Sequence, residues 1–336
     1  MTTLYETQDE RILARATHIL ALDPIQGADR IERATILGYK VVVEKNQFQV
    51  GDLVIYFAID SILDKDNPQF KEFTKPIKTK KIRGVYSQGL VEPVSIVEYY
   101  GLKPTDLKED QDLTKELKVE KHMEDPLLLQ CRGSLPLGLR KTGENRIEEC
   151  TRVLREMKNQ KVIITMKYHG TSASYYWKDG TFLICGRNTI IDPTDTGKQS
   201  ACYLAMAKKH DLEKQMQEYK GNIAIQGEIV GPGILKNTLG LKELEFHPFY
   251  IWDIDMQRKY PYDEFLNVMQ RMKLTPVKLL YRGLFKEEWT KTSLLEWADS
   301  LRYPNYPAEG LVVMTEDVNH HHSFKAISRK FLVKWK

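Results

Sequence analysis

A short apolar stretch that ends in a lysine constrains this chain more than any other feature. Val162, Ile163 and Ile164 begin the stretch, and Lys167 closes it three residues before Gly170. An apolar run of this length predicts a buried strand, and the glycine predicts a turn directly after it. A lysine in that place is either a charge at a strand end or a covalent nucleophile. Because a single Lys-x-x-Gly match is common by chance, the rest of the sequence must decide between the two.

The composition is that of a folded protein. The chain has 336 residues, of which 42% are hydrophobic and 10% aromatic, and this supports a full core and two domains. The formal net charge is only +4, so an acidic partner would have to meet local basic patches. The sequence shows no targeting signal, no membrane-spanning run and no Cys-x-x-Cys pair. We therefore expect a cytoplasmic or nuclear protein without a membrane partner, a zinc site or a disulfide framework.

The N-terminal region predicts a small β domain. Residues 12–63 are β-rich, with two strands joined by a Gly-Asp turn, and a further strand is expected at 89–94. Because no strong helical pattern lies between these strands, a small barrel or sandwich is favoured.

A basic stretch interrupts this β-rich region, with Phe70 and Phe73 interleaved. Two interpretations are equally compatible with it. One is a solvated loop anchored by two aromatic side chains, and the other is a patch that binds the phosphate backbone of a nucleic acid. The basic residues are Lys71, Lys75, Lys78, Lys80, Lys81 and Arg83.

Residues 101–125 change in character and end the first domain. A turn at Lys103-Pro104 precedes a dense mixed-charge segment from Lys108 to Lys121. This pattern predicts a linker with at most one short helix. We expect a first domain of residues 1–125, linker included, and a second domain of residues 126–336.

The second domain interleaves strands and helices. The turn Lys178-Asp179-Gly180 predicts a hairpin, and the periodicity of residues 201–219 predicts an amphipathic helix. The expected class is α+β, with antiparallel sheets and flanking helices. The other expected elements are a helix at 145–157, hairpin strands at 172–177 and 181–185, and strands at 162–167, 223–230, 249–254 and 310–314.

Beyond Lys167, charged residues recur at the ends of apolar stretches. These motifs are Lys167-Tyr168-His169-Gly170, Cys185-Gly186-Arg187-Asn188, Gln226-Gly227-Glu228, Phe249-Tyr250-Ile251-Trp252-Asp253, Glu309-Gly310-Leu311-Val312 and Ser323-Phe324-Lys325. Each alone is adequately explained as a strand end. Together and in this order they resemble the motif set of covalent nucleotidyltransferases, the superfamily of polynucleotide ligases and mRNA-capping guanylyltransferases.

Two patterns narrow the resemblance. Lys-x-His-Gly-Thr and Gly-Glu-x-x-Gly-Pro-Gly are similar to RNA ligases of the phage two-domain type. The N-terminal region, with Val50-Gly51-Asp52 and Gly89-Leu90-Val91, resembles the Deinococcus/Naegleria-type RNA ligase family. This resemblance covers nearly the whole chain and implies an OB-fold β-barrel before a ligase-type nucleotidyltransferase domain. DNA ligases and capping enzymes carry their OB domain after the last motif, and Lys325 would leave no room for one before Lys336.

Nucleotidyl transfer explains what Lys167 would need. A lysine must be neutral to attack the α-phosphorus of ATP, yet its unperturbed pKa is about 10.4. Desolvation and neighbouring cations lower such a pKa. We expect Lys325 and a bound divalent metal ion to be those cations. By the resemblance, Lys167 is the nucleophile, Lys325 contacts the phosphate, and Glu309 holds Mg²⁺ or Mn²⁺.

The resemblance also implies the residues that bind the nucleotide. Glu228 would contact the ribose or a metal-bound water, and Phe249 would stack on adenine. Arg187 would contact the phosphate or ribose, and Arg146 the leaving pyrophosphate. A carboxylate at an apolar strand end needs a partner, which favours a site role for Glu228 and Glu309. Phe249, however, lies in a run that a buried strand also explains.

Two positions depart from the family pattern. Naegleria-type members can carry aspartate where this chain has His169, so we expect His169 to follow the phage-type pattern, in which the histidine serves the later steps. The last motif is often Lys-x-Lys, but here Ser323 stands in the first position. A second cation would have to come from Lys330 or Lys334, or the site works with Lys325 alone.

The adjacent histidines His320, His321 and His322 raise the question of a metal site. Neighbouring residues of an extended chain point in alternate directions, so all three cannot face one ion. We therefore interpret them as part of a solvated loop.

The sequence thus predicts an ATP-dependent RNA ligase that works through lysyl-AMP and adenylylated RNA. The expected partner is RNA with 3′-OH and 5′-phosphate ends in a nicked duplex, bound by the OB domain of a monomer. One alternative is a capping guanylyltransferase or DNA ligase, and another is an OB-fold tRNA-binding module with an unrelated partner domain. A third is a nucleic-acid-binding protein with a decayed ligase core, which the retention of Lys167, Glu228, Glu309 and Lys325 disfavours.

Overall fold

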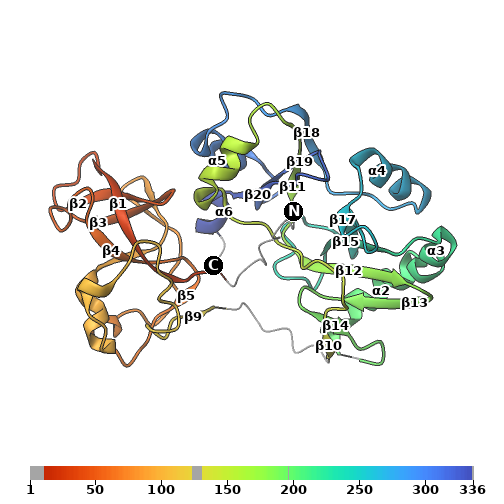
Figure 1. The fold of residues 1–336 in the computed structure, drawn as a ribbon, viewed down its shortest axis with the longest axis horizontal. Coiled ribbons are helices and arrows are strands. Elements are labelled where there is room, and N and C mark those ends of the chain that lie inside the picture. The colour runs from red at the N-terminus through yellow and green to blue at the C-terminus, as the bar shows by residue number, and fades with distance from the viewer. Residues whose placement is uncertain (1–10, 123–130, 196, 335–336) are drawn as a thin grey trace. The chain divides into compact units, whose positions relative to one another are not determined.

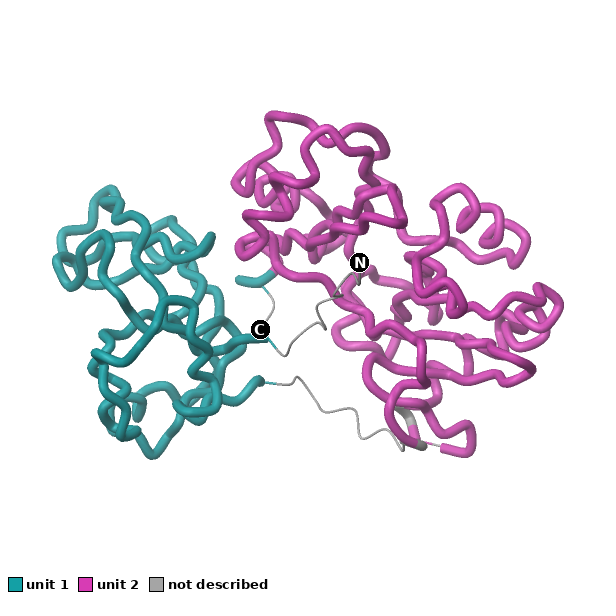
Figure 2. The backbone as a smooth tube through the Cα atoms, viewed as in Figure 1, with its two compact units in different colours: residues 1–126, 332–336 teal, residues 127–331 magenta. Residues whose placement is uncertain are grey.

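The protein, a computed structural model, is described for residues 11–122, 131–195 and 197–334. The chain divides into two compact units, one of residues 1–126 with 332–336 and the other of residues 127–331 (Figure 2). Each unit has its own sheets and its own apolar core. Within the described ranges, none of the helices has the length and apolar character that a membrane crossing requires.

The first unit is built on a bent antiparallel sheet with the strand order β3-β2-β1-β4-β8. The first half of β1 (Ala14–Pro24) pairs with β4, and its second half pairs with β2. Its register shifts between Ile19 and Ala21, where an irregularity of the bulge type lets a strand bend and serve two halves of a barrel. The predicted small β domain is therefore present. Its other strands are β2 Ile31–Ile36, β3 Tyr39–Glu44, β4 Leu53–Phe57, β5 Ser61–Ile62, β6 Lys80–Ile82, β7 Val85–Ser87, β8 Leu90–Pro93 and β9 Glu120–Lys121, and its 3₁₀ helices are η1 Pro68–Phe70, η2 Val94–Tyr100 and η3 Pro104–Asp106.

The mixed-charge segment expected to be a linker instead packs into this unit. Leu113 and Leu117 are fully buried in the same apolar cluster as Phe57. The backbone N–H of Leu113 donates to the carbonyl oxygen of Ala14 at 2.9 Å, and β9 pairs with β5. The linker prediction was wrong because the charges around the two leucines dominate the composition, although a four-residue spacing of leucines is enough to bury one side of a short segment.

Replacing Leu117 by alanine tests this packing. Removal of a fully buried leucine side chain typically lowers the free energy of unfolding by about 2–5 kcal/mol. We expect faster hydrogen–deuterium exchange throughout β1 and β4, measured by mass spectrometry. Leu20→Ala is the control, because Leu20 is 56% exposed in the same unit. Equal exchange in the two variants would contradict the packing described here.

The second unit contains two antiparallel sheets, each packed against helices (Figure 1). The larger has the order β10-β14-β13-β12-β15-β16-β17 and contacts α2, α3 and α4, and the smaller has the order β18-β11-β19-β20 and contacts α5. The strands are β10 Cys131–Ser134, β11 Lys161–Lys167, β12 Thr171–Lys178, β13 Thr181–Cys185, β14 Thr189–Ile191, β15 Ile223–Val230, β16 Glu245–Asp253, β17 Arg258–Lys259, β18 Leu279–Leu284, β19 Gly310–Thr315 and β20 Ser323–Ile327. The helices are η4 Ile147–Glu149, α1 Thr151–Glu156, α2 Lys198–Lys209, α3 Leu212–Tyr219, α4 Tyr262–Arg271 and α5 Lys291–Ser300. The last helix, α6 Arg329–Lys334, begins in this unit, and its residues from 332 onward belong to the first unit.

These elements confirm the predicted α+β class and the predicted strands, but the helices differ. The hairpin turn at Asp179-Gly180 has positive φ at both residues, 47° and 81°, as a type I′ turn requires. The single helix expected at 201–219 is broken at Asp211, whose φ of 45° is left-handed. The helix expected at 145–157 is divided into the 3₁₀ turn η4 and the short α1.

The register of the smaller sheet orders the residues on one of its faces. Residues paired across antiparallel strands share a face, as do alternate residues along one strand. The opposite face of β11 is also buried, against α5 and its neighbours, which explains the continuous apolar run in the sequence. Three successive rows result: Lys167 with Gly310, then Thr165 with Val312 and Lys325, then Ile163 with Met314 and Ser323.

Candidate active site

Lys167 is the last residue of β11, and a carboxylate is its closest partner. Its Nζ donates a hydrogen bond to Oε2 of Glu309 at 3.0 Å. The Tyr303 hydroxyl donates a hydrogen bond to the carbonyl oxygen of Lys167. The same hydroxyl accepts a hydrogen bond from the backbone N–H of Glu309 at 3.3 Å. Tyr303 thus holds the lysine and the carboxylate together. Tyr303 is not among the predicted site residues, because a tyrosine in a Pro-rich loop carries no sign of the strand end that it meets.

A second carboxylate approaches from the larger sheet. Oε1 of Glu228, on β15, accepts a hydrogen bond from the backbone N–H of Gly170 at 3.1 Å. A Cβ atom at Gly170 would lie 2.2 Å from the carbonyl oxygen of Ile229, so only glycine fits there. His169 Nδ1 lies 3.4 Å from Glu309 Oε2. The turn from one sheet to the other therefore runs between two carboxylates.

Three further cations belong to the same cluster. The backbone N–H of Lys325 donates to the carbonyl oxygen of Asn145 at 2.8 Å, and the backbone of Arg146 pairs with that of Lys325 in an isolated parallel β-bridge. Arg187 follows β13 in an exposed turn, and its charge lowers the pKa of Lys325. The structure thus brings together seven of the eight predicted site residues: Arg146, Lys167, His169, Arg187, Glu228, Glu309 and Lys325.

The carboxylates determine the protonation of Lys167. Burial lowers its pKa, but the charges of Glu309 and Glu228 outweigh burial and hold the pKa above the usual lysine value. Among the neighbouring cations, the charge of Arg187 lowers this pKa, but the two carboxylates outweigh it as well. Lowering of the pKa by Lys325 and a bound metal ion therefore stays a prediction, and the carboxylates alone favour a protonated Lys167.

The other charged groups of the cluster titrate away from their usual ranges. Burial, and after it the charges of Lys167 and Arg146, lowers the pKa of Lys325 to about 7. Burial raises the pKa of Glu228 to about 7, against the opposing charge of Lys167. Burial also opposes ionisation of Glu309, but Lys167 and His169 hold its pKa at about 2. Such divergent pKa values in one place are typical of a functional site.

The donor set near Lys167 fits a hard divalent cation that also binds phosphate. Mg²⁺ prefers oxygen ligands and is usually held by one or two carboxylates together with waters and substrate phosphates. In the part of the chain that the structure describes, no three His, Cys, Asp or Glu side chains form a cage of their own. The two carboxylates Glu228 and Glu309, from different sheets, instead match a site in which the protein and a substrate phosphate bind the ion together.

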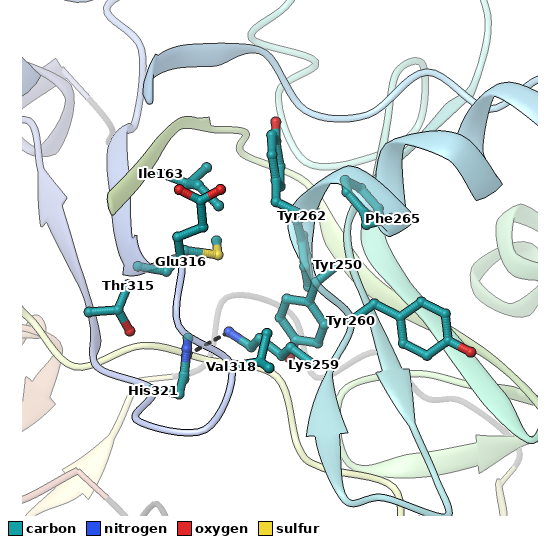
Figure 3. Close-up of a pocket in the computed structure, with 12 residues that line it drawn as sticks. Ile163, Tyr250, Lys259, Tyr260, Tyr262, Phe265, Thr315, Glu316, Val318 and His321 are labelled. Carbon is teal, nitrogen blue, oxygen red and sulfur yellow. Dashed lines mark hydrogen bonds between the residues drawn. The ribbon is translucent and has the colours of Figure 1, made fainter. Parts of the chain in front are cut away.

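Phe249 lies at a bulge in β16, where Gln226 pairs with Tyr250 and the next residue, Gly227, pairs with Pro248. It is half-buried and lines a cavity together with Tyr250 and Lys259, both of which are labelled in Figure 3. A role in stacking on adenine stays a prediction.

The histidine loop and the two alternative cations differ in their exposure. His320 is exposed, as predicted, but His321 accepts a hydrogen bond from Nζ of Lys259 at 2.8 Å in the same cavity (Figure 3). The prediction of a solvated loop is therefore wrong for His321. Lys330 and Lys334 are both exposed residues of α6.

Comparison with known proteins gives family and structural matches along most of the chain. A family model described as RNA ligase matches residues 160–336, and one described as an OB-fold domain matches residues 13–94. A search of curated protein sequences finds no match.

The structure is similar to several solved structures of Naegleria gruberi RNA ligase. An apo mutant has a TM-score of 0.84 and 28% identity, over 96% of this chain and 98% of that chain. The ligase with PPi has the same TM-score and identity, over 97% and 99%. A mutant with ATP and Mn has a TM-score of 0.85 and 27% identity, over 96% and 98%. These matches confirm an OB-fold domain followed by a ligase-type domain.

Replacing Lys325 by methionine should raise the melting temperature. The pKa of Lys325 is lower in the folded protein (about 7) than in the unfolded chain (about 10.4), so the unfolded chain binds more protons between these values. The charged lysine therefore destabilises the fold fully below pH 7, and the effect fades as the pH rises toward 10.4. We expect an increase of about 2–4 °C near pH 6.5 and a smaller one at pH 9, by calorimetry.

Lys291→Met is the matched control. Burial lowers the pKa of Lys291 too, but its Nζ donates hydrogen bonds to the carbonyl oxygen of Glu148 and to Oγ1 of Thr151, which methionine would lose. Its removal should lower the melting temperature. A decrease of the same size for Lys325→Met would show that Lys325 stabilises the fold and would refute the electrostatic description.

Proposed function

The chain belongs to the RNA ligase family, and we propose that it is an ATP-dependent RNA ligase that forms lysyl-AMP at Lys167. The supporting observation is the position of the Lys167 amine at a strand end. It lies between carboxylates from two sheets and near Lys325, a cation that could bind a phosphate. The similar Naegleria gruberi RNA ligase was solved with ATP and Mn, with AMP and Mn, and with PPi. ATP and Mg²⁺ or Mn²⁺ are therefore the proposed cofactors.

In the first step, the neutral Nζ of Lys167 forms a bond to the α-phosphorus of ATP, the bond from that phosphorus to pyrophosphate breaks, and Nζ releases one proton to solvent. A divalent ion held by Glu309 and Glu228 would offset their charge and so move the pKa of Lys167 toward the range in which the amine is neutral. Lys325 and Arg187 stabilise the negative charge on the transferring phosphate. Arg146, beside Lys325, contacts the leaving pyrophosphate.

Two transfers complete the reaction. An oxygen of the RNA 5′-phosphate attacks the phosphorus of AMP, and the bond to Nζ of Lys167 breaks. The RNA 3′-hydroxyl then attacks the activated 5′-phosphorus, and AMP leaves. His169 serves these later steps, since it lies beside Glu309 where phosphate oxygens pass. Phe249 stacks on adenine, and Glu228 contacts the ribose.

The proposed setting follows the same residues. All of the cluster comes from the second unit of one chain, which supports a monomer. Cys150, Cys185 and Cys202 are buried thiols, and burial raises the pKa of each. Unreactive buried thiols suit a reducing cytoplasm or nucleus.

Labelling with α-³²P-ATP and Mg²⁺ tests the nucleophile. We expect label on the denatured chain, and its loss in Lys167→Met. Lys161→Met is the control, because Lys161 is an exposed lysine at the other end of β11. Absence of an adduct at every pH and with either metal would refute the ligase function. An adduct from GTP alone would assign the chain to the capping enzymes.

RNA binding by the first unit is the second part of the proposal. The basic stretch folds partly into the hairpin β6–β7, and Lys80, Lys81 and Arg83 are exposed on it. Nζ of Lys81 lies 5.7 Å from the ring centre of Tyr86, so an aromatic face accompanies the charges. This combination supports binding of a nucleic acid backbone over a solvated loop.

The triple variant with glutamine at Lys80, Lys81 and Arg83 should weaken nick sealing and leave adenylylation unchanged. Each lost phosphate contact reduces the slope of log affinity against log salt concentration by about 0.9 on a duplex. For nicked RNA, the magnitude of this slope should therefore decrease by up to about 3 in the triple variant. The control carries glutamine at the exposed Lys103, Lys108 and Lys115 of the same unit. Equal salt slopes in both triple variants would remove the hairpin from the RNA-binding surface.

A further inference from the structure

A buried lysine outside the predicted motifs lies at the cavity of Figure 3. Lys259, on β17, is 6% exposed at its side chain. Its Nζ donates to Nε2 of His321 at 2.8 Å and lies 4.1 Å from the ring centre of Tyr250. The nearest carboxylate oxygen, Oε1 of Glu144, is 3.8 Å away. A buried ammonium group with one distant carboxylate is incompletely neutralised.

Glu144 connects this lysine to the active site. Its other carboxylate oxygen accepts a hydrogen bond from Oγ of Ser323. Ser323 precedes Lys325 by two residues on the same face of β20, a distance of about 7 Å along a strand. Asn145, which follows Glu144 in the chain, accepts a hydrogen bond at its carbonyl oxygen from the backbone N–H of Lys325. Through Glu144, Lys259 is therefore linked to Ser323, whose row on the smaller sheet comes directly after the row of Lys325.

Two cations gather around Glu144. Arg140 adds its charge to that of Lys259, and its guanidinium lies 5.7 Å from the ring centre of Trp252. Burial lowers the pKa of Lys259 to about 8 although Glu144 opposes this, and His321 is held neutral because burial and then Lys259 lower its pKa. Two cations thus lie near Glu144, and the other carboxylate that lines the cavity, Glu316, is already paired with Arg282. A ligand with several negative charges would complete the balance.

The order of the rows indicates which anion fits. In-line displacement places the leaving group on the side of the phosphorus opposite the attacking amine. Lys167 occupies the first row, Lys325 the second and Ser323 the third. A nucleotide whose α-phosphate lies between Lys167 and Lys325 therefore directs its remaining phosphates toward the third row.

We propose that Lys259 binds the terminal phosphates of the nucleoside triphosphate and the pyrophosphate that leaves. It supplies from β17 the second cation that Ser323 does not provide. This inference rests on the proposed function, because it requires attack by Lys167 on a triphosphate. The competing explanation is a purely structural network that joins β17 to the loop after β19 through His321.

Lys259→Met and Glu144→Gln separate the two explanations, because binding predicts effects of opposite sign. Loss of a hydrogen bond to a charged group changes affinity by about 10- to 100-fold. We expect Lys259→Met to raise the KM for ATP in lysyl adenylylation and the inhibition constant for pyrophosphate by that factor. Glu144→Gln removes the competing carboxylate and should lower the pyrophosphate inhibition constant several-fold. A structural network would weaken pyrophosphate binding in both variants.

A step without a triphosphate provides the internal control. Sealing of a nicked RNA that already carries 5′-AMP should stay near the rate of the unaltered protein in Lys259→Met, and Lys259→Arg should keep most of the ATP affinity. Lys291 is a half-buried lysine on α5 of the same unit. The variant Lys291→Met should leave pyrophosphate inhibition unchanged.

Two results would overturn the role of Lys259. One is equal loss of adenylylation and of sealing with the adenylylated nick, and the other is weaker pyrophosphate binding in Glu144→Gln. If Lys259→Met does not fold, the sign of the Glu144→Gln effect decides alone. Failure of the unaltered chain to adenylylate would instead refute the proposed function, and so differs from failure of this inference.

Discussion

The hydrogen bond between Lys167 and Glu309 is the interaction on which the rest of the site depends. It forms because the end of β11 meets the beginning of β19, with Lys167 opposite Gly310. The approach of the strands leaves no room for a side chain: a Cβ atom at Gly310 would lie 2.0 Å from the carbonyl oxygen of Ala326, and its φ is +151°. The Glu-Gly pair therefore has one physical meaning. Glycine lets the third strand pass, and the glutamate before it reaches the lysine.

The cluster around this pair is organised for a charged ligand more than for stability. Lys325 is buried among other cations, and its pKa of about 7 reflects that strain, while Glu228 binds its proton until about pH 7 because burial opposes its charge. A protein interior usually pairs or excludes such charges. In the proposed reaction a nucleotide and a divalent ion would provide the missing opposite charges, so that substrate binding and neutralisation of the cluster would be the same event.

Prediction from sequence succeeded where local pattern and chain order carry the information. The strands that end in Lys167 and begin at Gly310 are continuous apolar runs, and their collinear motifs identified the residues that meet at the site. It failed where long-range packing decides. The burial of Leu117 is invisible among surrounding charges, and the helix break at Asp211 depends on one left-handed residue. Tyr303 and Lys259 are joined to the site only by the fold.

Lys259 also shows why a missing motif residue need not mean a missing function. A phosphate responds to the position of positive charge and not to the strand that carries it, so a cation from β17 is equivalent to one from β20 if both reach the same row. The exchange has a structural consequence. A lysine at the position of Ser323 would extend from the sheet that carries the nucleophile, whereas Lys259 extends from the larger sheet and is shielded by Glu144 and His321. Substitution of Glu144 or His321 would therefore change the effective charge of Lys259. The affinity for pyrophosphate can change in this way while the residues that contact the transferred phosphate stay the same.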